Sequence, residues 1–306
     1  MSNLRRFFWL TVGLGVYVWH TQGKTISENI KLSKYQPPPR IAQLAKSTRM
    51  TEKGQRLFYL TNPQIEPKGS GLAPCKKSSS TDKDNDNTNT LGCYIPAKGI
   101  FILEVNDQRL HGVMETTAAH EMLHAAYHEL SDSEQDTLNI QLLEAFDQSQ
   151  DSGLKKLVGI YRQRDPKVVS NELHSLLGTK VANLSPALEK HYQKYFIDRS
   201  AVVALSKNYE QAFTQFETKA QQLERQLLAL KASLERLESR AKEHRTTLDR
   251  IDPRKSDEYN QQVNTYNQFV REINQQSQAY NQILRSYKSL SAEEKSLNNA
   301  LTSGAP

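Results

Sequence analysis

The last third of the chain carries a heptad pattern of apolar residues. From residue 209 to residue 251 apolar side chains alternate at spacings of four and three, and the spacing resumes from residue 259 to residue 287. This repeat is typical of coiled coils because it keeps one apolar seam along each helix. Asp252-Pro253 separates the two runs, and His244 lies on the seam, where we interpret it as a packing residue. The pattern predicts an antiparallel helical hairpin over residues 200–306, suited to a coiled-coil partner, to self-association or to a spacer role.

The middle of the chain combines a short apolar run with signals for helix starts. Residues 100–105 (IFILEV) are apolar, partly β-branched, and bounded by glycine before and Asn-Asp after, so they predict a strand. Thr116 and Thr117 are candidate N-caps for a helix over residues 118–130.

Capping residues mark several further helices. Ser131 and Glu134 form a capping box. Two dipeptides place proline directly after a capping residue, as at many helix starts: Asp165-Pro166 and Ser185-Pro186. Gly178 is expected to end the helix that begins at Pro166. The predicted helices cover residues 132–146, 154–162, 166–178 and 186–198. The fold class we expect is α+β and predominantly helical, with a small domain over residues 61–199 before the hairpin.

The N-terminal end has the layout of a targeting segment. Arg5 and Arg6 precede an apolar run over residues 7–19. A basic start followed by a short apolar stretch predicts a signal peptide or a signal-anchor over residues 1–23, and either cleavage or retention fits the sequence. Residues 24–60 follow as a polar, proline-rich linker with a short helix at 41–46. We therefore expect an extracytoplasmic protein, secreted or held by a single membrane anchor.

The chain has two cysteines, Cys75 and Cys93, separated by a polar stretch rich in Ser, Thr, Asn, Asp and Lys. Their spacing is not that of a zinc-binding Cys-x-x-Cys pair. Two interpretations remain, a disulfide and two free thiols. Export favours the disulfide, because such bonds persist outside the cytosol.

The net charge of +6 is concentrated near the N-terminus. Residues 1–60 carry ten basic residues against two acidic ones, a net charge of +8. A nucleic-acid-binding module would place this charge on a folded surface with elements that enter a groove or stack on bases. The composition therefore gives no support for a nucleic-acid partner.

The sequence His120-Glu121-Met122-Leu123-His124 carries the clearest chemical signal. On a helix, residues i and i+4 lie about 40° apart and one turn along, so both imidazoles can bind one metal ion. Glu121 lies about 100° around from His120, where its carboxylate can reach a metal-bound water. The motif predicts a Zn²⁺ site with His120 and His124 as ligands. A strand beside such a site, as residues 100–105 could be, can hold an extended peptide by backbone pairing.

A catalytic zinc site needs a third protein ligand. His128 lies about 12 Å along the same helix from His120, too far for a shared ion. Glu172 is the better candidate, because it lies on a separate predicted helix among apolar residues, where a carboxylate needs a partner. The alternative is an exposed helix glutamate without a ligand role. His174 lies about 200° around the helix from Glu172 and is expected to face away from the metal.

Together, His120, Glu121, His124 and Glu172 resemble the gluzincin class of zinc metallopeptidases, whose pattern is HExxH followed by a helical glutamate. Asn171-Glu172 and Ser175 also match part of the Asn-Glu-x-x-Ser-Asp element of the thermolysin group, but residue 176 is Leu instead of Asp. This difference leaves the support of the zinc-binding histidines unassigned.

The resemblance implies a zincin-like domain over residues 61–199 that hydrolyses peptide bonds with a metal-activated water. Glu121 would accept the proton of the water and pass it to the leaving amine. A Tyr or His outside the motifs would stabilise the oxyanion, and His191, Tyr192 and Tyr195 are the candidates. We therefore expect a zinc metalloendopeptidase that acts on a protein or peptide substrate. The alternative is a structural or interaction protein in which the coiled coil is the functional part and the zinc site is vestigial.

Overall fold

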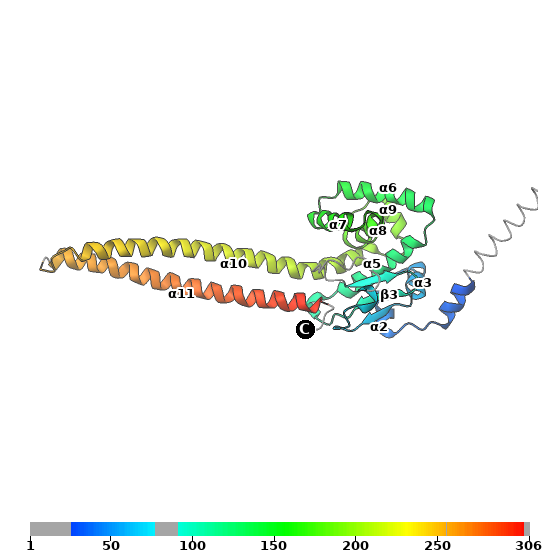
Figure 1. Cartoon of the computed structure of the whole chain (residues 1–306), viewed down its shortest axis with the longest axis horizontal. Coiled ribbons are helices and arrows are strands. Elements are labelled where there is room, and N and C mark those ends of the chain that lie inside the picture. The colour runs from blue at the N-terminus through cyan, green and yellow to red at the C-terminus, as the bar shows by residue number, and fades with distance from the viewer. Residues whose placement is uncertain (1–25, 77–90, 255, 303–306) are drawn as a thin grey trace, which may run out of the picture. The chain divides into compact units, whose positions relative to one another are not determined.

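The structure, a computed structural model, describes residues 26–76, 91–254 and 256–302 (Figure 1). The targeting segment expected over residues 1–23 lies outside these ranges. The described residues fall into two compact units. One unit includes the chain up to Tyr209 and again from Ala300, and the other runs from Glu210 to Asn299. The predicted fold class is confirmed at the level of a predominantly helical chain with one small sheet.

The sheet of the first unit has three strands in the order β1-β3-β2: β1 (Gln64–Glu66), β2 (Gly92–Ile95) and β3 (Gly99–Leu103). The apolar run predicted as a strand is β3, and each of its residues is buried. β1 pairs with β3 in parallel and β2 pairs with it in antiparallel orientation. Because β3 is paired on both sides, its backbone cannot hold an extended peptide, and the interpretation of residues 100–105 as a peptide-binding strand is wrong.

Helices surround this sheet. Between residues 39 and 192 the helices of this unit are α2 (Pro39–Ser47), α3 (Glu52–Leu60), α4 (Ala73–Lys76), α5 (Val113–His128), α6 (Asp132–Gln148), α7 (Ser152–Arg164), α8 (Val169–Lys180) and α9 (Pro186–Tyr192), with one short 3₁₀ turn before α5 and another before α8. α5 lies centrally, with β2 and β3 packed on it together with α2, α3 and α8, while α6 and α7 pack on α8 (Figure 1). The short helix expected at residues 41–46 lies within α2, and the rest of the expected linker also contains α3; the two helices bury Ile41, Leu44 and Phe58.

The start of α5 differs from the prediction. The helix begins at Val113, with Gly112 as its N-cap at φ 101°, so Thr116 and Thr117 lie inside it. The hydroxyl of Thr117 donates to the Val113 carbonyl at 2.8 Å and therefore does not cap the helix. A Cβ at position 112 would lie 2.4 Å from the Leu205 carbonyl oxygen. Only glycine satisfies both the left-handed backbone and this close approach. The sequence prediction missed this N-cap because it considered the usual capping residues Ser, Thr, Asp and Asn.

Two predicted helix ends are also wrong. α8 continues through Gly178 to Lys180, because this glycine serves helix packing: a Cβ there would lie 2.5 Å from Cδ1 of Leu123 on α5. The helix after Ser185 ends at Tyr192, before the expected residue 198. The capping box of Ser131 and Glu134 is confirmed at the start of α6.

Both cysteines lie within the described residues. Cys75 and Cys93 form a disulfide that joins α4 to β2, beside the buried cluster of Leu72, Phe101 and Leu103. The predicted disulfide is thus confirmed. No helix in the described ranges is long and apolar enough to cross a membrane.

The long helices α10 (Arg199–Leu248) and α11 (Ser256–Ala300) follow the heptad pattern. In the second unit, Leu237 and Ala241 of α10 pack against Phe269 of α11. His244 lies in this seam, with Nδ1 3.1 Å from the amide oxygen of Gln262. The break at Asp252-Pro253 lies between the two helices, as predicted. α10 begins within the first unit, which extends to Tyr209.

Candidate metal centre

The structure brings His120, His124 and Glu172 together from two helices. The Nε2 atoms of the two histidines are 3.1 Å apart, and the Glu172 oxygens lie 3.7 Å from His120 Nε2 and 3.6 Å from His124 Nε2. Zn–ligand bonds of about 2 Å at tetrahedral angles place ligand atoms about 3.3 Å apart. The spacing of the three side chains therefore suits one zinc-sized ion. Of the described residues, this is the group with metal-binding geometry.

Close packing of α5 against α8 produces this arrangement. The histidines are one turn apart on α5, as the spacing predicts. α8 buries Leu173, Leu176 and Leu177, which places Glu172 on the side of α8 that faces the histidines. Glycine at position 178 permits the close approach of the two helices.

Asn171 supports one of the histidines. Its Oδ1 lies 2.9 Å from Nδ1 of His124. An amide oxygen can only accept, so Nδ1 of His124 carries the proton and Nε2 is left with its lone pair for a metal. Asn171, the residue before Glu172, thus gives His124 the hydrogen bond that an acid at position 176 would be expected to provide. Leu176 is instead a core residue. Sequence reasoning noted Asn171 as part of a motif but gave it no role.

Glu172 is a mostly buried carboxylate, and one of its oxygens accepts no hydrogen bond within the described part of the chain. Its Oε2 is inaccessible to solvent and has no hydrogen-bond partner among the described residues. Burial acts to raise the pKa of Glu172, but the nearby imidazoles of His120 and His124 and a hydrogen bond from Tyr161 hold it below its usual value. Tyr161, on α7, was not singled out by the sequence, which offers no local signal that separates it from the other tyrosines.

Glu121 points from α5 toward β2. The residue is 6% exposed, and burial raises its pKa to about 7. The nearby His124 and a hydrogen bond from the Tyr94 backbone N–H act to lower it, while Glu172 acts to raise it. Glycine at position 92 leaves room here, because a Cβ would lie 3.5 Å from Cγ of Glu121 and 2.6 Å from Cγ2 of Thr117. The result is a carboxyl group that both holds and releases a proton near neutral pH.

The remaining histidines on α5 and α8 lie outside the metal cluster. The His128 ring packs edge-on against Tyr94, at 5.7 Å between centroids. His174 is fully buried and stacks on Tyr192, with its Nε2 2.9 Å from Nε2 of His191. His128 and His174 are thus outside the group of described side chains with metal-binding geometry.

The three residues proposed for oxyanion stabilisation gather around His174. Tyr192 donates its hydroxyl to the His174 carbonyl at 2.7 Å, so this hydroxyl is committed to the backbone. Tyr195 is buried, with its ring 6.4 Å from that of His174. His191 is partly buried, and its burial lowers its pKa to about 4, with further lowering by Lys194 and Lys53 and an opposing effect of Glu134. These residues therefore form a packed cluster around His174.

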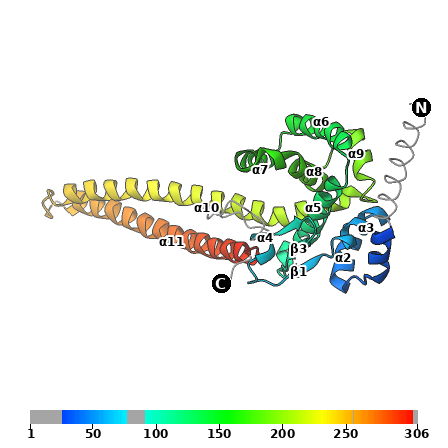
Figure 2. The same ribbon diagram turned by 45° about the vertical axis from the view of Figure 1, so that its right-hand side comes forward.

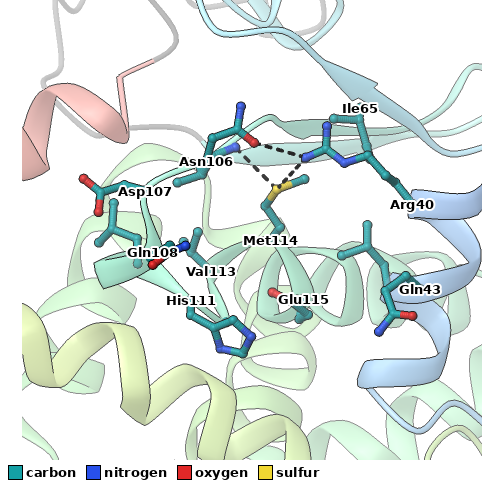
Figure 3. Close-up of a pocket in the computed structure, with 14 residues that line it drawn as sticks. Arg40, Gln43, Ile65, Asn106, Asp107, Gln108, His111, Val113, Met114 and Glu115 are labelled. Atoms are coloured by element: carbon teal, nitrogen blue, oxygen red, sulfur yellow. Dashed lines mark hydrogen bonds between the residues drawn. The ribbon is translucent and has the colours of Figure 1, made fainter.

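Two cavities in the first unit are separate from the metal centre. One, of about 300 Å³, lies at the start of α5 and is lined by Arg40, Asn106, His111, Met114 and Glu115, among others (Figure 3). The other, of about 770 Å³, lies between residues 35–41 and 62–67. Neither is lined by the metal cluster.

The chain matches no protein-family model, no curated protein and no solved structure.

Proposed function

We propose that the protein is a zinc-dependent peptidase. The observation that carries this proposal is the convergence of two imidazoles and one carboxylate at zinc spacing, beside a second carboxyl group with a pKa of about 7. Two histidines and one glutamate are a donor set of catalytic zinc sites, which keep one position for water or substrate. The His120, His124 and Glu172 side chains are each partly exposed.

The residues present fit a zinc ion for three reasons. The ligand atoms have suitable spacing, the Glu172 Oε2 is buried without another partner, and Asn171 fixes His124 in the tautomer that leaves Nε2 free. A bound zinc ion would supply a Lewis acid that lowers the pKa of water and polarises a carbonyl group.

Glu121 has the position and the pKa of a general base. It accepts a proton from the attacking water and later gives it to the leaving nitrogen. The Tyr94 N–H orients the carboxylate, since it donates to it from β2. A hydrogen bond from Tyr161 to Glu172 supports this carboxylate as a ligand.

The edge of β2 that faces away from β3 is the proposed binding site for the substrate backbone. The Leu103 N–H donates to the Leu91 carbonyl, so alternate residues 91, 93 and 95 face β3, whereas Gly92 and Tyr94 turn their backbone groups to the other side. The Tyr94 N–H reaches Glu121 from that side. Among the described strands, none pairs with this edge. An extended peptide paired here would pass next to the general base, which favours a peptide as the substrate.

A paired substitution tests the proposed function. Glu121→Gln should retain zinc at one ion per chain but lower the hydrolysis of a denatured protein substrate by roughly 10²–10⁴-fold, because the proton acceptor is lost. Glu115→Gln, on the same helix but outside the cluster, is the matched control and should cleave like the unmodified chain.

Full peptidase activity of a zinc-loaded Glu121→Gln protein would contradict this mechanism. Zinc binding with no hydrolysis by the unmodified chain would instead favour the alternative, in which the helical hairpin is the functional part.

A further inference from the structure

The helical residues at the start of the described chain expose two large apolar side chains. Residues 26–34 are helical. Ile26 is 58% exposed and Ile30 is 51% exposed. Because the two are four residues apart, they lie on one face of the helix, one turn from each other. Each side chain therefore keeps a large apolar area in contact with solvent in the isolated protein.

The opposite face of this helix is fastened to α3. Arg56 donates to Glu28 and to Asn29, each at 2.7 Å, and Lys31 donates to the Leu60 carbonyl at 2.6 Å. Figure 2 shows this helix (blue) beside α3. With Glu28 and Lys31 turned to α3, helical geometry turns Ile26 and Ile30 outward. Ile26 and Ile30 form an apolar ridge, which is thus held in a fixed orientation on the first unit.

Basic residues accompany the ridge. Lys34 is exposed and lies one turn after Ile30 on the same face. Residues 26–60 carry seven basic residues against two acidic ones, a net charge of +5. An amphipathic helix with apolar residues flanked by lysine binds the interface of an anionic bilayer.

The sequence upstream of this helix favours a lipid surface over a protein partner. Residues 7–19 are the apolar run that follows Arg5 and Arg6, the pattern of a membrane-directed segment. The same end of the chain would therefore bring residues 26–34 close to a bilayer.

We propose that residues 26–34 lie in the interface of an anionic membrane. Ile26 and Ile30 enter the boundary between head groups and acyl chains, and Lys34 contacts the head groups. Through Arg56, the contact fixes the orientation of the first unit at the membrane surface. This interaction surface is independent of zinc and of peptidase activity.

Local hydrogen exchange in the full chain on vesicles tests the proposal. Because residues 7–19 are expected to bind vesicles in every variant, exchange of the amides of residues 26–34 is more informative than total binding. We expect exchange to slow by roughly tenfold or more on vesicles of phosphatidylglycerol and phosphatidylcholine, relative to pure phosphatidylcholine. Lys34→Gln should reduce this protection by about fivefold.

Two variants separate ridge insertion from general vesicle binding. Ile26→Ser combined with Ile30→Ser should abolish the protection. Ile140→Ser, which alters an isoleucine 62% exposed on α6, should retain it and is the matched control. Retained protection in the double variant, or equal exchange on both vesicle types, would overturn the proposal. Protection that appears without vesicles as protein concentration rises would also overturn it, because a second copy would then cover the ridge.

Discussion

Replacing Gly178 with alanine tests the packing that forms the metal cluster. The added Cβ would lie 2.5 Å from Cδ1 of Leu123 and 2.7 Å from Cε1 of Tyr192. Both neighbours are fully buried, and the Tyr192 ring is also held by its hydrogen bond to the His174 carbonyl. Neither side chain has space into which it can move, so α8 must shift away from α5. That shift would also move Glu172 from His120 and His124.

The expected magnitude combines two opposing effects. Overpacking of a core costs about 1–3 kcal/mol, while replacing glycine in a helix interior gains up to about 1 kcal/mol. We therefore expect Gly178→Ala to lower the free energy of unfolding of the first unit by about 1–2 kcal/mol and to weaken zinc binding. Gly159→Ala is the control, since its Cβ on α7 would meet no atom within 4 Å. It should raise the free energy of unfolding by about 0.5–1 kcal/mol.

Hydrogen exchange of the amides in α5 and α8 measures this difference without interference from the long helices, whose signal would dominate circular dichroism. A competition titration with a zinc chelator measures the affinity. The reasoning is refuted if Gly178→Ala is as stable as Gly159→Ala and binds zinc as tightly as the unmodified chain.

Three further predictions concern the metal ligands and their surroundings. Glu172→Ala should weaken zinc binding strongly while His128→Ala leaves it nearly unchanged, and the opposite result in a chelator competition would exclude the gluzincin-like ligand set. Asn171→Ala should lower zinc affinity by about 10–100-fold and Asn171→Asp should restore it, because the support of His124 is lost and regained; equal affinities would show that Asn171 has no such role. The pKa of His191 is about 4 in the folded protein, below the ordinary value of 6.5. As the pH falls, His191 is therefore protonated in the unfolded chain before it is protonated in the folded protein. Stability should therefore be complete above pH 6.5 and fall toward pH 4 by at most about 3 kcal/mol. Urea titrations across this range should show a smaller loss for His191→Gln, and an unchanged pH dependence would contradict this assignment.

Local patterns in the sequence were sufficient for several features. The spacing of His120 and His124 determines their proximity, because one helical turn brings residues four apart onto the same face. The heptad repeat similarly predicts α10 and α11, and the capping box of Ser131 and Glu134 predicts the start of α6. These features depend on neighbours within one or two turns of the chain.

The tertiary structure decided the features that depend on distant residues. It places Asn171 against His124. The sequence motif gave no such support, because residue 176 is leucine instead of the expected acid. The tertiary structure pairs β3 on both sides and leaves β2 as the strand that reaches Glu121. It also uses Gly178 for packing instead of for a helix end. The physical reason is that helical geometry fixes short spacings for any sequence, whereas contacts between separate elements depend on which side chains fit together in the packed core.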